Sequence, residues 1–149
     1  MKEIPNPYQP GTCFFCGADN PIGLKLKFHD TEAEPKELIC RVNPSSLYAG
    51  YGRILHGGIQ SGLFDEIMGW TSFQLTGRLG VTSSLQIDFL KPLYVEQEIE
   101  VRCRFTTQEG SKLNFSAEIT DPEGTICTKA TGSYMIVEAE RFNRMIGGE

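Results

Sequence analysis

Two features near the middle of the chain have residue types and spacing that could carry chemistry. The first is the turn His56-Gly57-Gly58, and the second is the carboxylate of Asp65, nine residues after the histidine. Glycines at the start of a helix leave backbone N–H groups uncovered, at the positive end of the helix dipole. Such groups suit a carbonyl oxygen, an oxyanion or a phosphate. The simpler alternative is a junction in which His56 only caps the helix.

The helix predicted over residues 57–76 carries only two charged residues, Asp65 and Glu66. A helix that is apolar nearly all round is expected to be buried nearly all round. One of its stripes is made of small residues with the aspartate among them: Gly58, Ser61, Gly62, Asp65 and Gly69. We therefore expect Asp65 to be buried against another backbone, where burial favours the neutral carboxyl and suits proton transfer.

Both carboxylates also have a purely structural interpretation. Asp65 could cap or bridge a neighbouring segment, because structural networks bury carboxylates as well. Glu66 lies on a different face of the helix, and we expect it to be satisfied locally or to lie at the rim of a site.

Helical geometry separates the glycine turn from the aspartate. Nine residues correspond to about 2.5 turns and about 13–14 Å, so His56 and Asp65 point in roughly opposite directions. They lie too far apart to act on one atom within one chain. If both serve chemistry, the spacing favours a symmetric dimer in which one chain supplies the Gly57 N–H and the other supplies Asp65.

The elements that must position these groups are mostly strands. Alternating apolar residues and turn signals predict strands over 22–28, 37–42, 79–91, 97–107, 112–120 and 125–137, with a short helix at the end. Short turns between strands indicate antiparallel pairing. The sequence thus predicts an α+β domain over residues 22–149, in which about five to six antiparallel strands pack on one long helix. Residues 1–21 are expected to form an irregular arm.

Charge and composition exclude several classes of function. Fourteen Lys and Arg against nineteen Asp and Glu give a net charge of −5. A chain without a basic tract is a poor ligand for nucleic acid or for an anionic membrane surface. The opening residues are polar and rich in proline, with no apolar signal segment. Together with five cysteines, this favours a reducing compartment, and we expect a cytoplasmic protein.

The cysteines do not by themselves predict a metal site. Cys13 and Cys16 have the spacing of half a zinc site, but no second such pair follows, and His29 and His56 are the only histidines. Cys40 and Cys103 occupy apolar strand positions. We expect no bound metal, and a Cys13–Cys16 turn that is dispensable for turnover.

Longer stretches of the chain resemble a known family. The run GRILHGGIQSGLFDEIMGW, followed by VTSSLQIDFLKPL, resembles the PaaI-like acyl-CoA thioesterases of the hotdog-fold superfamily. The segment CFFCGADNPIGLKLKF is similar to the opening of one bacterial branch, and the likeness extends from about Cys13 to Val137. This resemblance implies a hotdog fold, in which an antiparallel sheet wraps a long central helix.

The resemblance also implies roles for individual residues. Gly57 would polarise the thioester carbonyl through its N–H, and His56 would orient that turn. Asp65 would act as general base or nucleophile, and Thr82 would help to position the water. Where some relatives carry Asn or Gln six residues before the histidine, this chain has Gly50.

Substrate contacts and assembly follow from the same resemblance. The substrate would be an acyl-CoA or aryl-CoA bound at a subunit interface of a homodimer or a dimer of dimers, and no cofactor is implied. Gly58 and Glu66 are further candidates for substrate binding. The cations Arg53, Lys91 and Arg78 could contact the phosphates of coenzyme A, and the simpler interpretation, which we favour for any single one, is a solvated surface side chain.

Two other functions remain open at this point. A hotdog dehydratase or hydratase would need a catalytic histidine paired with a carboxylate, and His56 belongs to no such motif. A non-catalytic acyl-CoA-binding protein would commonly carry a DNA-binding segment, and the 21-residue arm is short and not basic.

Overall fold

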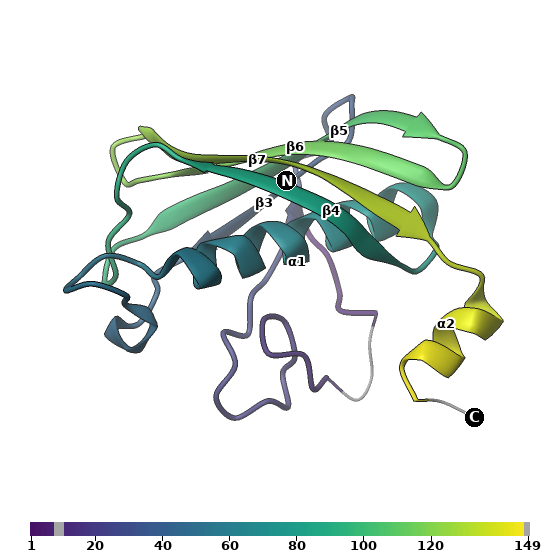
Figure 1. Ribbon diagram of the computed structural model, residues 1–149, viewed down its shortest axis with the longest axis horizontal. Helices are drawn as coiled ribbons and strands as arrows, with labels where there is room; N and C mark the ends of the chain where they lie inside the picture. Colours follow the sequence, from purple (N-terminus) through teal and green to yellow (C-terminus); the bar gives the residue numbers. More distant parts are fainter. Residues whose placement is uncertain (8–10, 148–149) are drawn as a thin grey trace.

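An antiparallel sheet and one long helix make up most of the computed structural model in Figure 1, which describes residues 1–7 and 11–147. The strands are β1 (Lys2–Glu3), β2 (His29–Asp30), β3 (Glu37–Val42), β4 (Gly80–Phe89), β5 (Ile99–Glu109), β6 (Lys112–Thr120) and β7 (Ile126–Ile136). The helices are the 3₁₀ turn η1 (Ser46–Tyr48), α1 (Gly57–Thr76) and α2 (Ala139–Met145). Of the helices in this described part, none is long and apolar enough to cross a membrane.

The sheet confirms the predicted α+β class. Its strands follow the order β1-β2-β3-β5-β6-β7-β4, and every neighbouring pair is antiparallel. The seven strands exceed the predicted five to six because β1 and β2 have two residues each, too few to show a period in the sequence. β4 forms the opposite edge, and Gly80 is its only buried residue.

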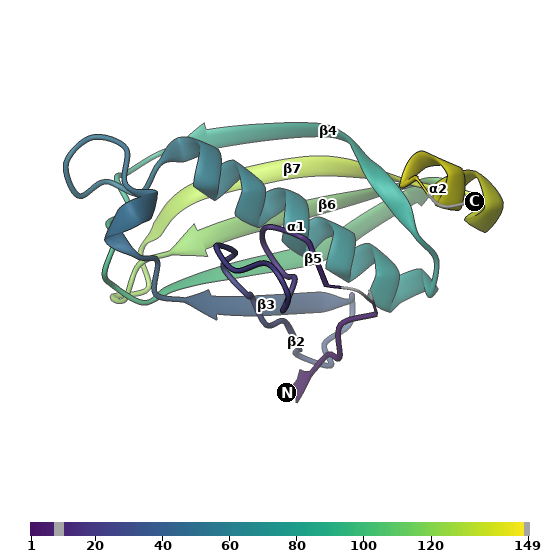
Figure 2. The ribbon, with the colours of Figure 1, turned by 90° about the horizontal axis from the view of Figure 1, so that it is seen from below.

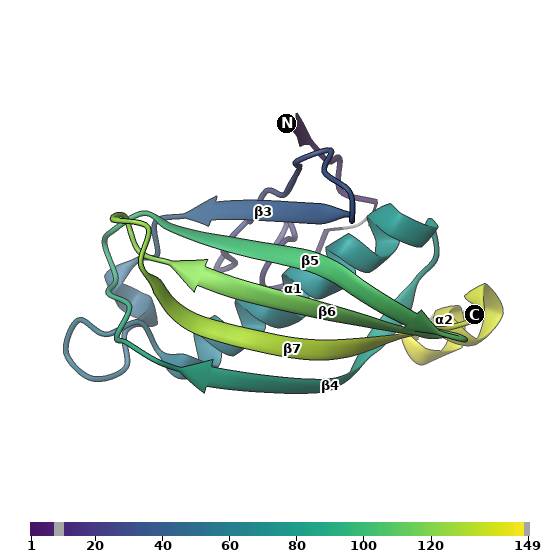
Figure 3. The ribbon, with the colours of Figure 1, turned by 90° about the horizontal axis from the view of Figure 1, so that it is seen from above.

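Three layers lie on top of one another. Figure 1 shows α1 beneath the sheet, and Figure 2 shows the N-terminal arm lying over α1 on the side away from the sheet. Figure 3 shows the other face of the sheet without a covering helix. The arm and the sheet therefore hold α1 between them.

α1 covers the residues predicted for it. It begins where the Nδ1 atom of His56 accepts a hydrogen bond of 2.8 Å from the Gly58 amide. It ends at Gly77, whose φ of 68° lies in the left-handed region that favours glycine. The buried residues on this helix are Gln60, Leu63, Phe64, Ile67, Met68, Trp70, Thr71 and Ser72. The apolar ones among them form the core with side chains from β3, β5, β6 and β7.

The prediction of a strand over 22–28 is wrong. Leu26 and Phe28 are buried, as the alternation indicates, but Lys25 has a φ of 52°, which breaks the extended conformation. The amides of Leu24 and Leu26 donate to carbonyls of the arm, at Phe14 and Phe15, instead of to a strand. The alternating pattern therefore reports burial here, whereas the pairing partner is the irregular arm.

The packing of α1 on the sheet generates a prediction about stability. Leu63 is 2% exposed in the core, whereas Leu47 on η1 is 88% exposed. Leu63→Ala should lower the free energy of unfolding by about 2–5 kcal/mol, because it leaves a cavity under α1. Leu47→Ala should change it by less than about 0.5 kcal/mol. Urea unfolding followed by circular dichroism measures both, and similar losses for the two variants would contradict this account of the core.

Candidate active site

The turn before α1 leaves one amide available. Among the first four amides of the helix, Gly58 donates to the Nδ1 atom of His56, and those of Ile59 and Gln60 donate to the His56 carbonyl. Within the described residues, the Gly57 N–H is the one of these four with no acceptor. His56 thus caps the helix, as the simpler interpretation holds, and the same cap leaves the Gly57 amide open for an external oxygen.

A buried glutamine that the sequence analysis overlooked holds this turn in place. The side-chain amide of Gln60 donates to the carbonyl of Leu55 at 3.0 Å, and its oxygen accepts a 2.6 Å hydrogen bond from Thr128 on β7. Gln60 and Thr128 are both buried. The residue before His56 is thereby anchored to the sheet. A glutamine among apolar helical positions is the signal that could have found it, because buried amides need partners.

Asp65 and Thr82 lie together within one chain. The Thr82 hydroxyl donates a short hydrogen bond to the Asp65 carboxylate. This contact links the middle of α1 to the start of β4, and it leaves the carboxylate with lone pairs for a second donor.

Thr82 faces the helix because β4 is irregular. The pairing of β4 with β7 shifts register between Thr82 and Ser84. Leu85 and Ile87 pack against the core, and strict alternation would place Thr82 on the opposite face of the sheet. The bulge adds one residue to β4, so Thr82 lies on the same face of the sheet as Leu85 and Ile87 and contacts Asp65.

The expectation that Asp65 is buried is wrong for the single chain. Asp65 and Gly58 are exposed, and Ser61, Gly62 and Gly69 are half-buried. The physical reason is that this small-residue stripe lies at the margin of the packing between α1 and the sheet, where Asp65 bonds Thr82 on the edge strand β4. Only part of it is covered by the arm, where a Cβ at Gly62 would lie 1.9 Å from the Phe15 ring. Consequently, α1 is not buried all round.

Glu66, the next residue, has a different environment. One carboxylate oxygen accepts from the Cys13 thiol at 3.3 Å, and the other accepts from the indole N–H of Trp70 at 3.1 Å. Glu66 is half-buried and faces the arm, whereas Asp65 contacts β4. The structure therefore places the two neighbouring carboxylates in separate settings.

A cavity of about 720 Å³ adjoins both carboxylates. Asp65 and Thr82 line it, together with the rings of Trp70 and Phe73 and the two arm cysteines. It combines a polar corner with apolar walls, as small-molecule sites commonly do. Gly57 does not line this cavity, and along α1 it lies about 12 Å from Asp65.

The three candidate cations lie at two ends of the molecule. The Arg53 guanidinium lies 5.8 Å from the ring centre of Tyr94. Lys91 is exposed on the segment that continues to Leu93, whose carbonyl accepts from the Leu55 amide before the glycine turn. Arg78 is exposed beyond the other end of α1, about 30 Å away. Arg53 and Lys91 thus accompany Gly57, and Arg78 does not.

Gly50 lies beside the histidine. A Cβ at Gly50 would meet the Cα and Cδ2 atoms of His56 at 3.5 Å, so a side chain at this position would contact the imidazole.

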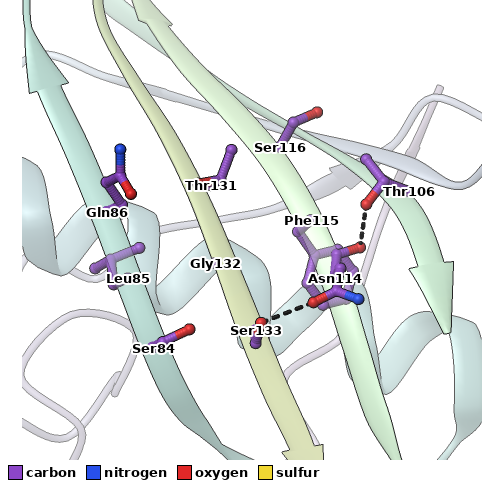
Figure 4. Close-up of a pocket in the computed structure, with 10 residues that line it drawn as sticks. All are labelled: Ser84, Leu85, Gln86, Thr106, Asn114, Phe115, Ser116, Thr131, Gly132 and Ser133. Atoms are coloured by element: carbon purple, nitrogen blue, oxygen red, sulfur yellow. Dashed lines mark hydrogen bonds between the residues drawn. The ribbon is translucent and has the colours of Figure 1, made fainter. Parts of the chain in front are cut away.

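A second hollow, of about 510 Å³, lies on the uncovered face of the sheet (Figure 4). Hydroxyl and amide groups line it, and among them Asn114 accepts a 2.7 Å hydrogen bond from Ser133. None of its described lining residues is a carboxylate, an imidazole or an amine, so it lacks a group for acid–base chemistry at neutral pH.

Comparison with known proteins assigns the chain to a family. The sequence model of the thioesterase superfamily matches residues 52–128, which include the glycine turn, α1 and β4. A protein of uncharacterized function from Schizosaccharomyces pombe is 26% identical over 121 residues, covering 78% of this chain and 68% of that protein. Acyl-coenzyme A thioesterase THEM4 of Bos taurus is 24% identical over 129 residues, covering 86% of this chain and 52% of that protein. The chain thus spans about half the length of THEM4.

Solved structures agree with this fold. The PaaI protein of Escherichia coli superimposes with a TM-score of 0.65 at 17% identity, over 68% of this chain and 73% of that one. A hypothetical thioesterase of Streptococcus pneumoniae, solved with coenzyme A, gives a TM-score of 0.67 at 22% identity, over 74% and 85%. The family match covers more than half of the sequence and the fold is shared. The chain therefore belongs to the thioesterase superfamily and has the hotdog fold of its PaaI-like members.

Proposed function

We propose that this protein hydrolyses an acyl-CoA or aryl-CoA thioester to the free acid and coenzyme A. The observation that carries the proposal is the Asp65–Thr82 pair in a cavity that the rings of Trp70 and Phe73 also line. Family membership supports thioester hydrolysis in general. Two of the structurally similar proteins, from Streptococcus pneumoniae and Streptococcus mutans, were solved with coenzyme A and with acetyl CoA, which supports this class of substrate.

The proposed site takes groups from two chains. Gly57 and Asp65 belong to one rigid helix and lie about 12 Å apart, so they do not converge on one thioester within a chain. The open stripe of small residues around Asp65 lets a second backbone come close. In a homodimer, one protomer would supply the Gly57 N–H and its partner the carboxylate, with Arg53 and Lys91 near the coenzyme A phosphates.

The chemistry in this site needs little acid catalysis. The Gly57 N–H and the helix dipole stabilise the negative charge that develops on the carbonyl oxygen. Asp65, oriented by Thr82, takes a proton from water as the water oxygen bonds to the carbonyl carbon. The carbon–sulfur bond then breaks, and the thiolate leaves with the bonding electrons and regains a proton. In the variant with Asp65 as nucleophile, an anhydride forms first and water then cleaves it.

The role of Asp65 can be tested by one substitution. Asp65→Asn should reduce kcat by about 10²–10⁴-fold, because the amide cannot accept the proton from water. The fold should persist, since Asp65 is exposed and the amide still accepts from Thr82. Thiol release from a panel of acyl-CoA and aryl-CoA esters measures turnover.

Glu66→Gln is the matched control, because it removes the neighbouring carboxylate while keeping its shape. Its loss in kcat should be far smaller. A larger loss for Glu66→Gln would reverse the assignment. If the wild-type protein binds the acyl-CoA and aryl-CoA esters without releasing thiol, it is a non-catalytic acyl-CoA-binding protein instead.

The shared site predicts complementation between two inactive variants. In Gly57→Val, the new side chain covers the amide and presses on Phe89, whose ring lies 3.4 Å from the Cβ position. Asp65→Ala removes the base. When the two are unfolded and refolded together, about half of the dimers are mixed, and each mixed dimer has one intact site. Thiol release should therefore return to about a quarter of the wild-type rate.

The control is each variant refolded alone, which should stay inactive. Differently tagged chains show whether mixed dimers form. Mixed dimers without recovered activity would mean that Gly57 and Asp65 do not share a site across chains.

A further inference from the structure

The arm brings two thiols to a carboxylate on α1. The Sγ atoms of Cys13 and Cys16 and a carboxylate oxygen of Glu66 all lie within 4.8 Å of one another. The sequence shows only half of a ligand set here, and the missing member lies 53 positions from Cys13. Folding of the arm across α1 supplies it.

The turn that carries the thiols is tightly built. The Cys16 amide donates to the Cys13 sulfur at 3.4 Å, and the Gly17 amide donates to the Cys13 carbonyl at 2.9 Å. A Cβ at Gly17 would lie 2.3 Å from the Gly11 carbonyl oxygen, so only glycine permits this path. Both sulfurs thereby point to the same side, and an N–H donor to sulfur stabilises a thiolate.

Trp70 orients the Glu66 carboxylate, which is the third group of the cluster. One oxygen of Glu66 accepts from the Trp70 indole N–H at 3.1 Å, which leaves the other oxygen toward Cys13 at 3.3 Å. Metal-binding carboxylates are commonly oriented by such an outer hydrogen bond. Trp70 is itself fixed, because it stacks on Phe28 with ring centres 4.5 Å apart.

The negative charge of Glu66 beside two thiols favours a bound cation. The Glu66 carboxylate lies beside both thiols, with one oxygen 3.3 Å from the Cys13 sulfur. In the described residues, no lysine or arginine forms an ion pair with Glu66. A divalent ion bound by two thiolates and this carboxylate would offset their negative charge.

We propose that Cys13, Cys16 and Glu66 bind one zinc ion that ties the N-terminal arm to α1. Zinc–sulfur bonds of about 2.3 Å and zinc–oxygen bonds of about 2.1 Å in a tetrahedron place ligand atoms about 3.5–3.8 Å apart, within the observed spread. Two thiolates with one carboxylate suit this borderline-soft ion better than Mg²⁺ or Ca²⁺.

The fourth position would open onto the cavity. Cys13, Cys16 and Glu66 all line the same cavity as Asp65 and Thr82, so water or a ligand in the cavity can complete the tetrahedron. The proposal replaces the expectation of no metal, which assumed that no further ligand lies near the cysteine pair. It does not depend on the proposed hydrolysis.

Cobalt titration of the reduced full-length protein tests the site without any turnover. Co²⁺ should bind at one ion per chain, with thiolate-to-cobalt absorption in the near ultraviolet, and Zn²⁺ should displace it. Cys16→Ser should abolish this absorption. Cys127→Ser is the matched control and should keep it, because the new hydroxyl finds acceptors at Asp121 and Thr125 where the thiol now lies.

A carboxylate pair tests the third ligand. Glu66→Gln should weaken cobalt binding by at least roughly 10-fold while both thiolate bands persist. Asp65→Asn removes an adjacent charge but no ligand, and should weaken binding by less than the Glu66 variant. Circular dichroism verifies that each variant is folded.

Three results would overturn the proposal. The first is the absence of stoichiometric cobalt binding by the reduced wild-type chain. The second is an unchanged spectrum in Cys16→Ser. The third is equal affinity for Glu66→Gln and the wild type, which would remove Glu66 from the ligand set. A Cys13–Cys16 disulfide that forms on oxidation in a chain that binds no metal when reduced would identify a redox pair instead.

Discussion

The rigidity of α1 determines where every candidate functional group lies. Its twenty residues form one unbroken rod, fixed at its start by His56 and at its end by Gly77. Successive residues on such a rod diverge by about 100°. Asp65 therefore bonds Thr82 on β4, whereas Glu66 bonds Cys13 of the arm. The two adjacent carboxylates thus have different surroundings. The same rod keeps Gly57 apart from both, since no bend brings the helix start toward its middle.

The arm and the sheet act on α1 in different ways. The sheet buries the broad apolar face of the helix, and that packing supplies most of the core. The arm covers only part of the opposite stripe, with Phe15 seated over Gly62 and Cys13 on Glu66. Without the arm, the cavity beside Asp65 would lose the wall that contains Cys13 and Cys16. A segment with little regular structure thus shapes the cavity that contains both carboxylates of α1.

Patterns within one element were predictable, whereas contacts between distant segments were not. The caps and apolar stripe of α1 gave its bounds, and alternation located β3 and the four long strands, because these signals are local. The alternation over 22–28 located the buried Leu26 and Phe28, but Ile22 is 72% exposed, and the segment is not a strand because Lys25 leaves the extended region. Thr82 faces Asp65 only because of a bulge that shifts the phase of β4. The contact between Cys13 and Glu66 depends on the path of the arm, and no periodic pattern in the sequence predicts that path.

The position of β4 at the edge of the sheet has a consequence for solubility. Within the described residues, no strand lies beside its outer row of backbone donors and acceptors. The strand ends at Phe89, and Phe89 and Leu90 are each 55% exposed. Neither a proline nor a lysine interrupts the strand, although such residues commonly blunt exposed edges. An unprotected edge of this kind is a template for further strand addition. If nothing covers it, the outer edge of β4 is therefore a place where the described structure is open to aggregation by strand addition.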